Sequence, residues 1–62
     1  MEVTYRDRTW TFDEALTVEQ MLKRIDVLPE SVLVVRDGTL VTEDQKLKPG
    51  DRVKVVGVIS GG

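Results

Sequence analysis

Alternating apolar and polar residues open the chain. Val3 and Tyr5 alternate with polar neighbours, and after Asp7-Arg8 the pattern resumes with Trp10 and Phe12. Two such runs around a short polar break predict a β-hairpin whose four apolar residues share one face. The turn type stays open, because Asp-Arg is a poorer hairpin turn than Asn-Gly.

A helical period replaces this alternation after Thr17. Thr17 and Gln20 have the spacing of a capping box, in which each side chain accepts a hydrogen bond from the other's backbone amide. Apolar residues then recur three and four positions apart, at Val18, Met21, Leu22 and Ile25. Leu28-Pro29 is predicted to end this helix, because a residue before proline disfavours helical backbone.

Two more strands are predicted on either side of Asp37-Gly38, a dipeptide that favours a tight turn. Val32–Val35 is a continuous apolar run, which indicates a strand covered on both faces, or covered on one face and apolar on the other. Thr39–Val41 is its expected partner. A polar connection over Thr42–Lys46 and a turn at Pro49-Gly50 then lead into the last strand.

The last strand has two different faces. Val53, Val55 and Ile59 are expected to lie on one of them, and Val56 and Val58 lie on the other with Arg52 and Lys54. The second valine pair is either buried or exposed, and exposed apolar patches often mark interfaces. The candidate partner-docking residues are Arg52, Lys54, Val56, Val58, Ile59 and Ser60.

The order strand, strand, helix, strand, strand, strand predicts an α+β fold. One helix cannot cover both faces of a sheet this size, so it packs on one face of a mixed sheet of four to five strands. The last strand is expected to lie beside the first and parallel to it. Residues 1–59 then form one domain, and residues 60–62 form a Ser-Gly-Gly tail.

Composition excludes most catalytic chemistry. The 62 residues include no Cys and no His, which removes thiol nucleophiles, imidazole bases, disulfides and the usual zinc ligands. A net charge of −2 argues against non-specific nucleic-acid binding. No apolar run is long enough to span a membrane, and no secretory signal opens the chain, so a cytoplasmic protein is expected.

The complete pattern resembles a known family. The capped helix beginning at Thr17-Val18, the Asp37-Gly38 turn, the segment Leu47–Val53 and the terminal Gly61-Gly62 occur in the order found in ubiquitin-like β-grasp sulfur carriers. The chain is similar to the ThiS/MoaD group, together with the tRNA-thiolation carriers and the small archaeal modifier proteins. The resemblance covers the whole chain and implies the β-grasp fold.

The resemblance also implies a function. In these families a partner adenylating enzyme uses ATP to activate the C-terminal carboxylate, here that of Gly62, and a persulfide donor supplies the sulfur of a thiocarboxylate. A downstream enzyme then passes the sulfur to a thiazole or a tRNA base. Thiamine and tRNA pathways both stay open, while a tail without proline in a short chain fits the molybdopterin carriers less well. The chain would thus be a co-substrate that binds no cofactor itself.

Physical chemistry suits the two terminal glycines to this role. Gly62 has no β-carbon to hinder a nucleophile, and Gly61 can adopt backbone conformations closed to other residues. The tail beyond Ile59 spans about 10 Å when extended, at ~3.3 Å per residue, so the body must dock close to the active site of its partner. The simpler alternative is a frayed terminus.

Two further groups of residues have competing interpretations. Glu43 and Asp44 could be a metal-binding pair, although a polar loop is the simpler interpretation without further ligands. In a ubiquitin-like modifier, the alternative function, the activated Gly62 would be joined to target lysines. Lysines of this chain could also accept such conjugation, at positions 23, 46, 48 and 54, although surface lysines commonly serve solubility.

Overall fold

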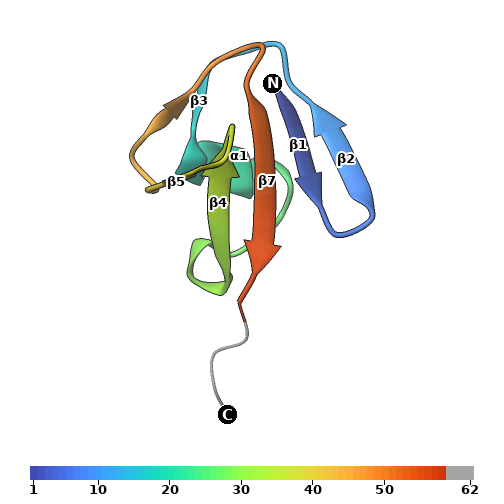
Figure 1. Ribbon diagram of the computed structural model, residues 1–62, viewed down its shortest axis with the longest axis vertical. Coiled ribbons are helices and arrows are strands. Elements are labelled where there is room, and N and C mark those ends of the chain that lie inside the picture. The colour runs from blue at the N-terminus through green and yellow to red at the C-terminus, as the bar shows by residue number, and fades with distance from the viewer. Residues whose placement is uncertain (59–62) are drawn as a thin grey trace.

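A mixed five-stranded sheet with one helix across one of its faces forms the body of the protein (Figure 1). This computed structural model describes residues 1–58. The strand order is β2-β1-β7-β4-β5. The strands of this sheet are β1 (Glu2–Tyr5), β2 (Arg8–Thr11), β4 (Val32–Arg36), β5 (Thr39–Val41) and β7 (Arg52–Gly57). The remaining elements are β3 (Leu16–Thr17), α1 (Val18–Arg24), η1 (Pro29–Ser31) and β6 (Lys46–Leu47).

Strand β7 pairs with β1 in parallel, as the sequence predicts. Val3 lies opposite Val53, and Tyr5 lies opposite Val55. On its other side β7 is antiparallel to β4, and β1–β2 and β4–β5 are antiparallel hairpins. The α+β prediction and the prediction of a mixed sheet covered by one helix are therefore confirmed.

The two hairpin turns differ in how well the sequence predicts them. Asp37 and Gly38 have φ values of 49° and 84°, as a type I′ turn requires at both central positions. The first turn is formed by Arg6 and Asp7, with φ 58° at Arg6, so the predicted turn at Asp7-Arg8 is wrong by one residue. Arg8 belongs to β2, where its guanidinium lies 5.0 Å from the centre of the Trp10 ring.

The helix begins as predicted but ends earlier. Gln20 donates its backbone N–H to Thr17 Oγ1 at 3.1 Å, and the Thr17 N–H donates to Gln20 Oε1 at 3.0 Å, which completes the capping box. Helix α1 ends at Arg24 rather than at Leu28. The N–H groups of Asp26 and Val27 donate to the carbonyls of Lys23 and Leu22 at 3.2 and 2.9 Å, which is a Schellman motif. Asp26 occupies its left-handed position with φ 61°, where glycine is the usual signal.

A second, two-stranded sheet was not predicted. Leu16 pairs with Leu47 and Thr17 pairs with Lys46, so β3 and β6 tie the start of the helix to the segment interpreted as a polar connection. Leu47 is fully buried. Two-residue strands carry no usable alternation, and sequence periodicity therefore misses them.

The core lies between the helix and the inner face of the large sheet. Its largest fully buried side chains are Met21, Leu22, Leu47, Val3 and Val18. Tyr5, Trp10 and Phe12 are partly buried against this core, on the same hairpin face as Val3, as the alternation predicts. The helix covers only one face, and so the other face of the sheet is open.

Candidate functional site

The central strand β7 carries both a core face and an open face. Val53 and Val55 are each 3% exposed and pack under the helix. Arg52, Lys54 and Val56 alternate with them and are exposed on the opposite face, as predicted. Because β7 has a neighbour on both sides, the open face continues across β1 and β4.

Exposed apolar side chains gather on the β7–β4–β5 half of the open face. Leu33 lies beside Val56, and Val35 lies beside Leu40, across neighbouring strands. Exposures are 47% for Leu33, 60% for Leu40, 39% for Val56 and 38% for Val58, and Val35 is half-buried. We call these residues the outer apolar face: Leu33, Val35, Leu40, Val56 and Val58. The alternative that Val56 and Val58 are buried is wrong.

The β7–β1 half of the open face is polar. Lys54 lies between Thr4 of β1 and Val35 of β4, and Arg52 lies opposite Glu2. The backbone of Arg52 is also held by the hairpin turn, because its carbonyl accepts from the Asp37 N–H at 3.0 Å. The two basic residues therefore border the outer apolar face, while the helix lies on the other side of the sheet.

The end of β7 is held from its β4 side, and the Tyr5 side chain lies near Gly57. Gly57 is paired with Val32, and a β-carbon at Gly57 would lie 3.8 Å from the Tyr5 hydroxyl oxygen. One residue further, the Val58 N–H donates to the Ser31 carbonyl at 2.9 Å. Contacts with the β4 side thus fix the backbone as far as Val58. The predicted site residues Ile59, Ser60, Gly61 and Gly62 lie outside the described residues.

Glu43 and Asp44 lie in the exposed loop that precedes β6. The pKa of the Asp44 carboxyl lies below its usual value. The main cause is a hydrogen bond that the carboxylate accepts from the Thr42 hydroxyl, and a backbone hydrogen bond contributes less. Within residues 1–58, no group of three or more acidic side chains is arranged to hold a metal ion. In the same part of the chain, no helix has the length and apolar character needed to cross a membrane.

Sequence reasoning found Val56 and Val58 of the outer apolar face but not Leu33 or Leu40. The signal for Leu33 was the unbroken apolar run Val32–Val35. That run allowed either a strand covered on both faces or a strand with one covered face and one apolar open face. Leu40 is a single apolar residue in a three-residue strand, so only the register against Val35 reveals that it joins the same surface.

A mixed sheet with parallel first and last strands and one helix on one face defines a ubiquitin-like β-grasp protein. More particularly, the chain belongs to the ThiS family, whose model matches residues 1–62. It is similar to the crystal structure of the thiamine biosynthesis protein ThiS from Geobacter metallireducens, with a TM-score of 0.70 and 28% identity. That match covers 100% of both chains. The resemblance to the ThiS/MoaD group of β-grasp sulfur carriers, predicted from the sequence, is thereby confirmed.

The two faces of β7 predict losses of stability of different size for the same substitution at adjacent residues. Val55→Ala removes buried methyl groups and is expected to lower the free energy of unfolding by about 2–3 kcal/mol. Val56→Ala makes the same change on the open face and is expected to cost less than about 1 kcal/mol. Urea denaturation of both variants tests this. Equal losses would contradict the assignment of the two faces.

Proposed function

We propose that this protein is a sulfur carrier in thiamine biosynthesis and that the carboxylate of Gly62 is the group that is activated. The observation that carries the proposal is the match of the family model over residues 1–62, which includes both terminal glycines. The structural match to the Geobacter thiamine biosynthesis protein, which covers the whole of both chains, supports the thiamine pathway over tRNA thiolation. The missing Cys and His agree with a role as protein substrate rather than enzyme.

The proposed chemistry has two stages. An oxygen of the Gly62 carboxylate attacks the α-phosphorus of ATP on a partner adenylating enzyme, which releases pyrophosphate and forms an acyl-adenylate. The terminal sulfur of a donor persulfide then attacks the acyl carbon, and AMP leaves. A thiol reduces the resulting S–S bond and is itself oxidised to a disulfide, which frees the thiocarboxylate. This thiocarboxylate supplies sulfur to a thiazole-forming enzyme.

The body of the protein serves as the docking element in this scheme. Val56 and Val58 lie just before Ile59 and the tail in sequence, and Leu33 extends the same surface on β4. We propose that the outer apolar face contacts the adenylating enzyme, with Arg52 and Lys54 at its border and Ile59 and Ser60 continuing toward the active site. Four residues, Ile59 and the Ser-Gly-Gly tail, separate Val58 from the Gly62 carboxylate, so docking on this adjacent surface keeps Gly62 within reach.

Intact-mass measurement tests the chemistry. After incubation with its adenylating enzyme, ATP, a persulfide donor and a thiol, the protein should gain the mass difference between sulfur and oxygen. Fragmentation should place this change on Gly62. A variant that lacks Gly61 and Gly62 is the control and should stay unchanged. Unmodified wild-type protein would contradict the proposal, whereas Gly62 joined to lysine side chains would favour a protein modifier.

Steady-state kinetics of adenylation test the docking surface separately. Leu33→Ser and Val56→Ser should each raise the KM for this protein about ten-fold, as expected for apolar residues near the centre of an interface, with little change in kcat. Leu28→Ser is the matched control, because Leu28 is 64% exposed and lies outside the outer apolar face. An unchanged KM in both face variants would overturn the docking assignment.

A further inference from the structure

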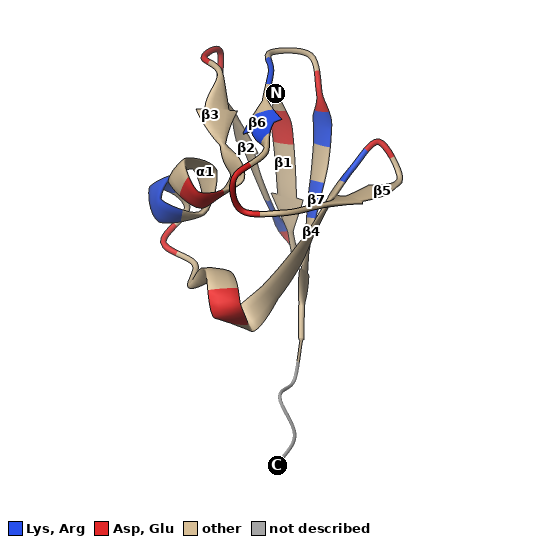
Figure 2. Cartoon of the chain, turned by 90° about the vertical axis from the view of Figure 1, so that its left-hand side faces the viewer, with Lys and Arg blue, Asp and Glu red and all other residues tan. Residues whose placement is uncertain are grey.

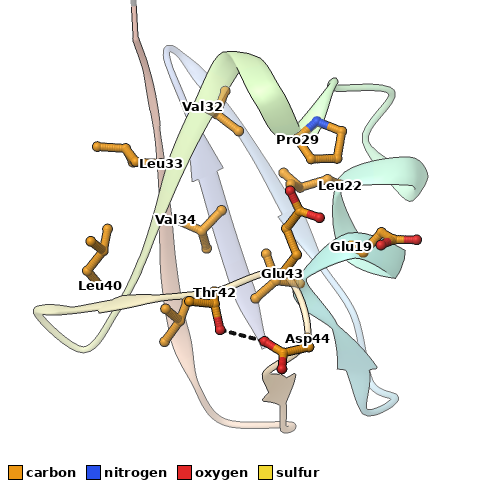
Figure 3. A pocket seen from close by; sticks show the side chains of 12 residues that line it. Glu19, Leu22, Pro29, Val32, Leu33, Val34, Leu40, Thr42, Glu43 and Asp44 are labelled. Atoms are coloured by element: carbon orange, nitrogen blue, oxygen red, sulfur yellow. Dashed lines mark hydrogen bonds between the residues drawn. The ribbon is translucent and has the colours of Figure 1, made fainter.

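An apolar groove lies at the edge of the large sheet, between α1 and the strands β4 and β5 (Figure 3). Its volume is about 650 Å³. The buried side chains of Val18, Leu22, Val32 and Val34 form its floor, and its exposed apolar surface comes mainly from Leu33, Leu40 and the half-buried Pro29. Leu33 and Leu40, which belong to the outer apolar face, lie at the rim and point away from Val32 and Val34. The groove therefore extends from the helix side of the sheet, around its edge, to the outer apolar face.

The groove exists because β5 is shorter than β4. Pairing between the two strands runs from the Arg36–Thr39 pair only to the Val34–Val41 pair. The chain then crosses to the helix, where the Glu43 carbonyl accepts from the Glu19 N–H at 3.1 Å. Val32 and Leu33 thus have no strand beside them on this edge.

One backbone acceptor faces this edge. In an antiparallel strand, successive residues direct their N–H and C=O groups to opposite sides. The Ser31 carbonyl accepts from Val58 on the β7 side, so the Val32 carbonyl points toward the groove side. The Val32 N–H donates to the Pro29 carbonyl. The Val32 carbonyl is therefore the backbone group that this edge offers to a ligand.

The charged side chains that line the groove are all acidic. Glu19 lies on the helix wall, and Glu43 and Asp44 lie on the loop wall (Figure 3). Figure 2 shows the same acidic segments on α1 and in the loop that follows β5. Lys23 pairs with Glu19 at 3.6 Å, whereas the loop carboxylates have no ion pair among the described residues. The Thr42 hydroxyl donates to the Asp44 carboxylate, which lowers the pKa of that carboxyl.

We propose that this groove binds a segment of a partner protein in which an apolar side chain stands next to an arginine or lysine. The apolar side chain would pack against Pro29 and Leu33, over the floor formed by Leu22 and Val32, and the cationic group would reach Glu43 and Asp44. The charged groups at the site are carboxylates, the Val32 carbonyl is an acceptor, and the Thr42 hydroxyl already donates to Asp44. A donor that carries positive charge is therefore complementary, and an anionic ligand is repelled. The groove shares Leu33 and Leu40 at its rim with the docking face proposed for adenylation, whereas Glu43 and Asp44 lie outside that face.

NMR titration of the full-length, ¹⁵N-labelled protein tests this surface without any assay of sulfur transfer. The probe is the peptide acetyl-Leu-Leu-Arg-amide, and acetyl-Leu-Leu-Glu-amide is its charge-reversed partner. The arginine peptide should shift the amide signals of Val32, Leu33, Val41 and Glu43. The glutamate peptide should bind at least about five-fold more weakly, because it meets carboxylates of like charge.

Matched double variants distinguish an effect of the loop carboxylates on peptide affinity from an effect of the protein's net charge. Glu43→Gln with Asp44→Asn should weaken the arginine peptide about five-fold, as expected for the loss of two exposed ion pairs. Glu2→Gln with Asp13→Asn changes the net charge equally but lies outside the groove, and it should leave the affinity unchanged. Equal weakening by both double variants, absence of shifts at the groove, or equal binding of both peptides would overturn the proposal. Concentration-dependent shifts of these amides without peptide would identify a second copy of the chain as the occupant and would also overturn it.

Discussion

The parallel pairing of β1 with β7 is the interaction on which the rest of the structure depends. It brings the last strand into the middle of the sheet, between β1 and β4, so that Val53 and Val55 complete the core beneath the helix. A strand in this position is hydrogen-bonded along both edges and buried on one face. The chain therefore reaches Val58 along the most highly paired element of the fold.

This constraint also gives the sheet its open face. The single helix α1 covers the inner side, and the alternation along β7 places Val56 and Val58 outside together with Leu33 and Leu40. A chain without Cys or His has few catalytic groups to offer, and these apolar side chains are suited to recognition instead. In the proposed function this protein contributes a surface and a terminus, and its partner enzymes supply the chemistry.

Much of this architecture could be predicted because local signals agree with the tertiary structure. The Thr17–Gln20 box, the Asp37-Gly38 turn and the alternation in β7 each have one strongly preferred backbone conformation. Other features depend on contacts between distant segments. Asp26 ends the helix without the usual glycine, the β3–β6 pair is too short to show a period, and Leu40 joins the outer apolar face only through its register with Val35. The role proposed for Gly61 and Gly62 comes from the family resemblance, and both glycines lie outside the described residues.

Native-state hydrogen exchange tests the central position of β7 most directly. If β7 is held by β1 and β4 together, its amides from Val53 to Val56 should exchange only through global unfolding. Their free energy of exchange should then equal the free energy of unfolding measured in denaturant, while residues of the edge strand β2 exchange at lower free energy. Exchange of the Val53 and Val55 amides as fast as that of Thr9 in β2 would contradict this account.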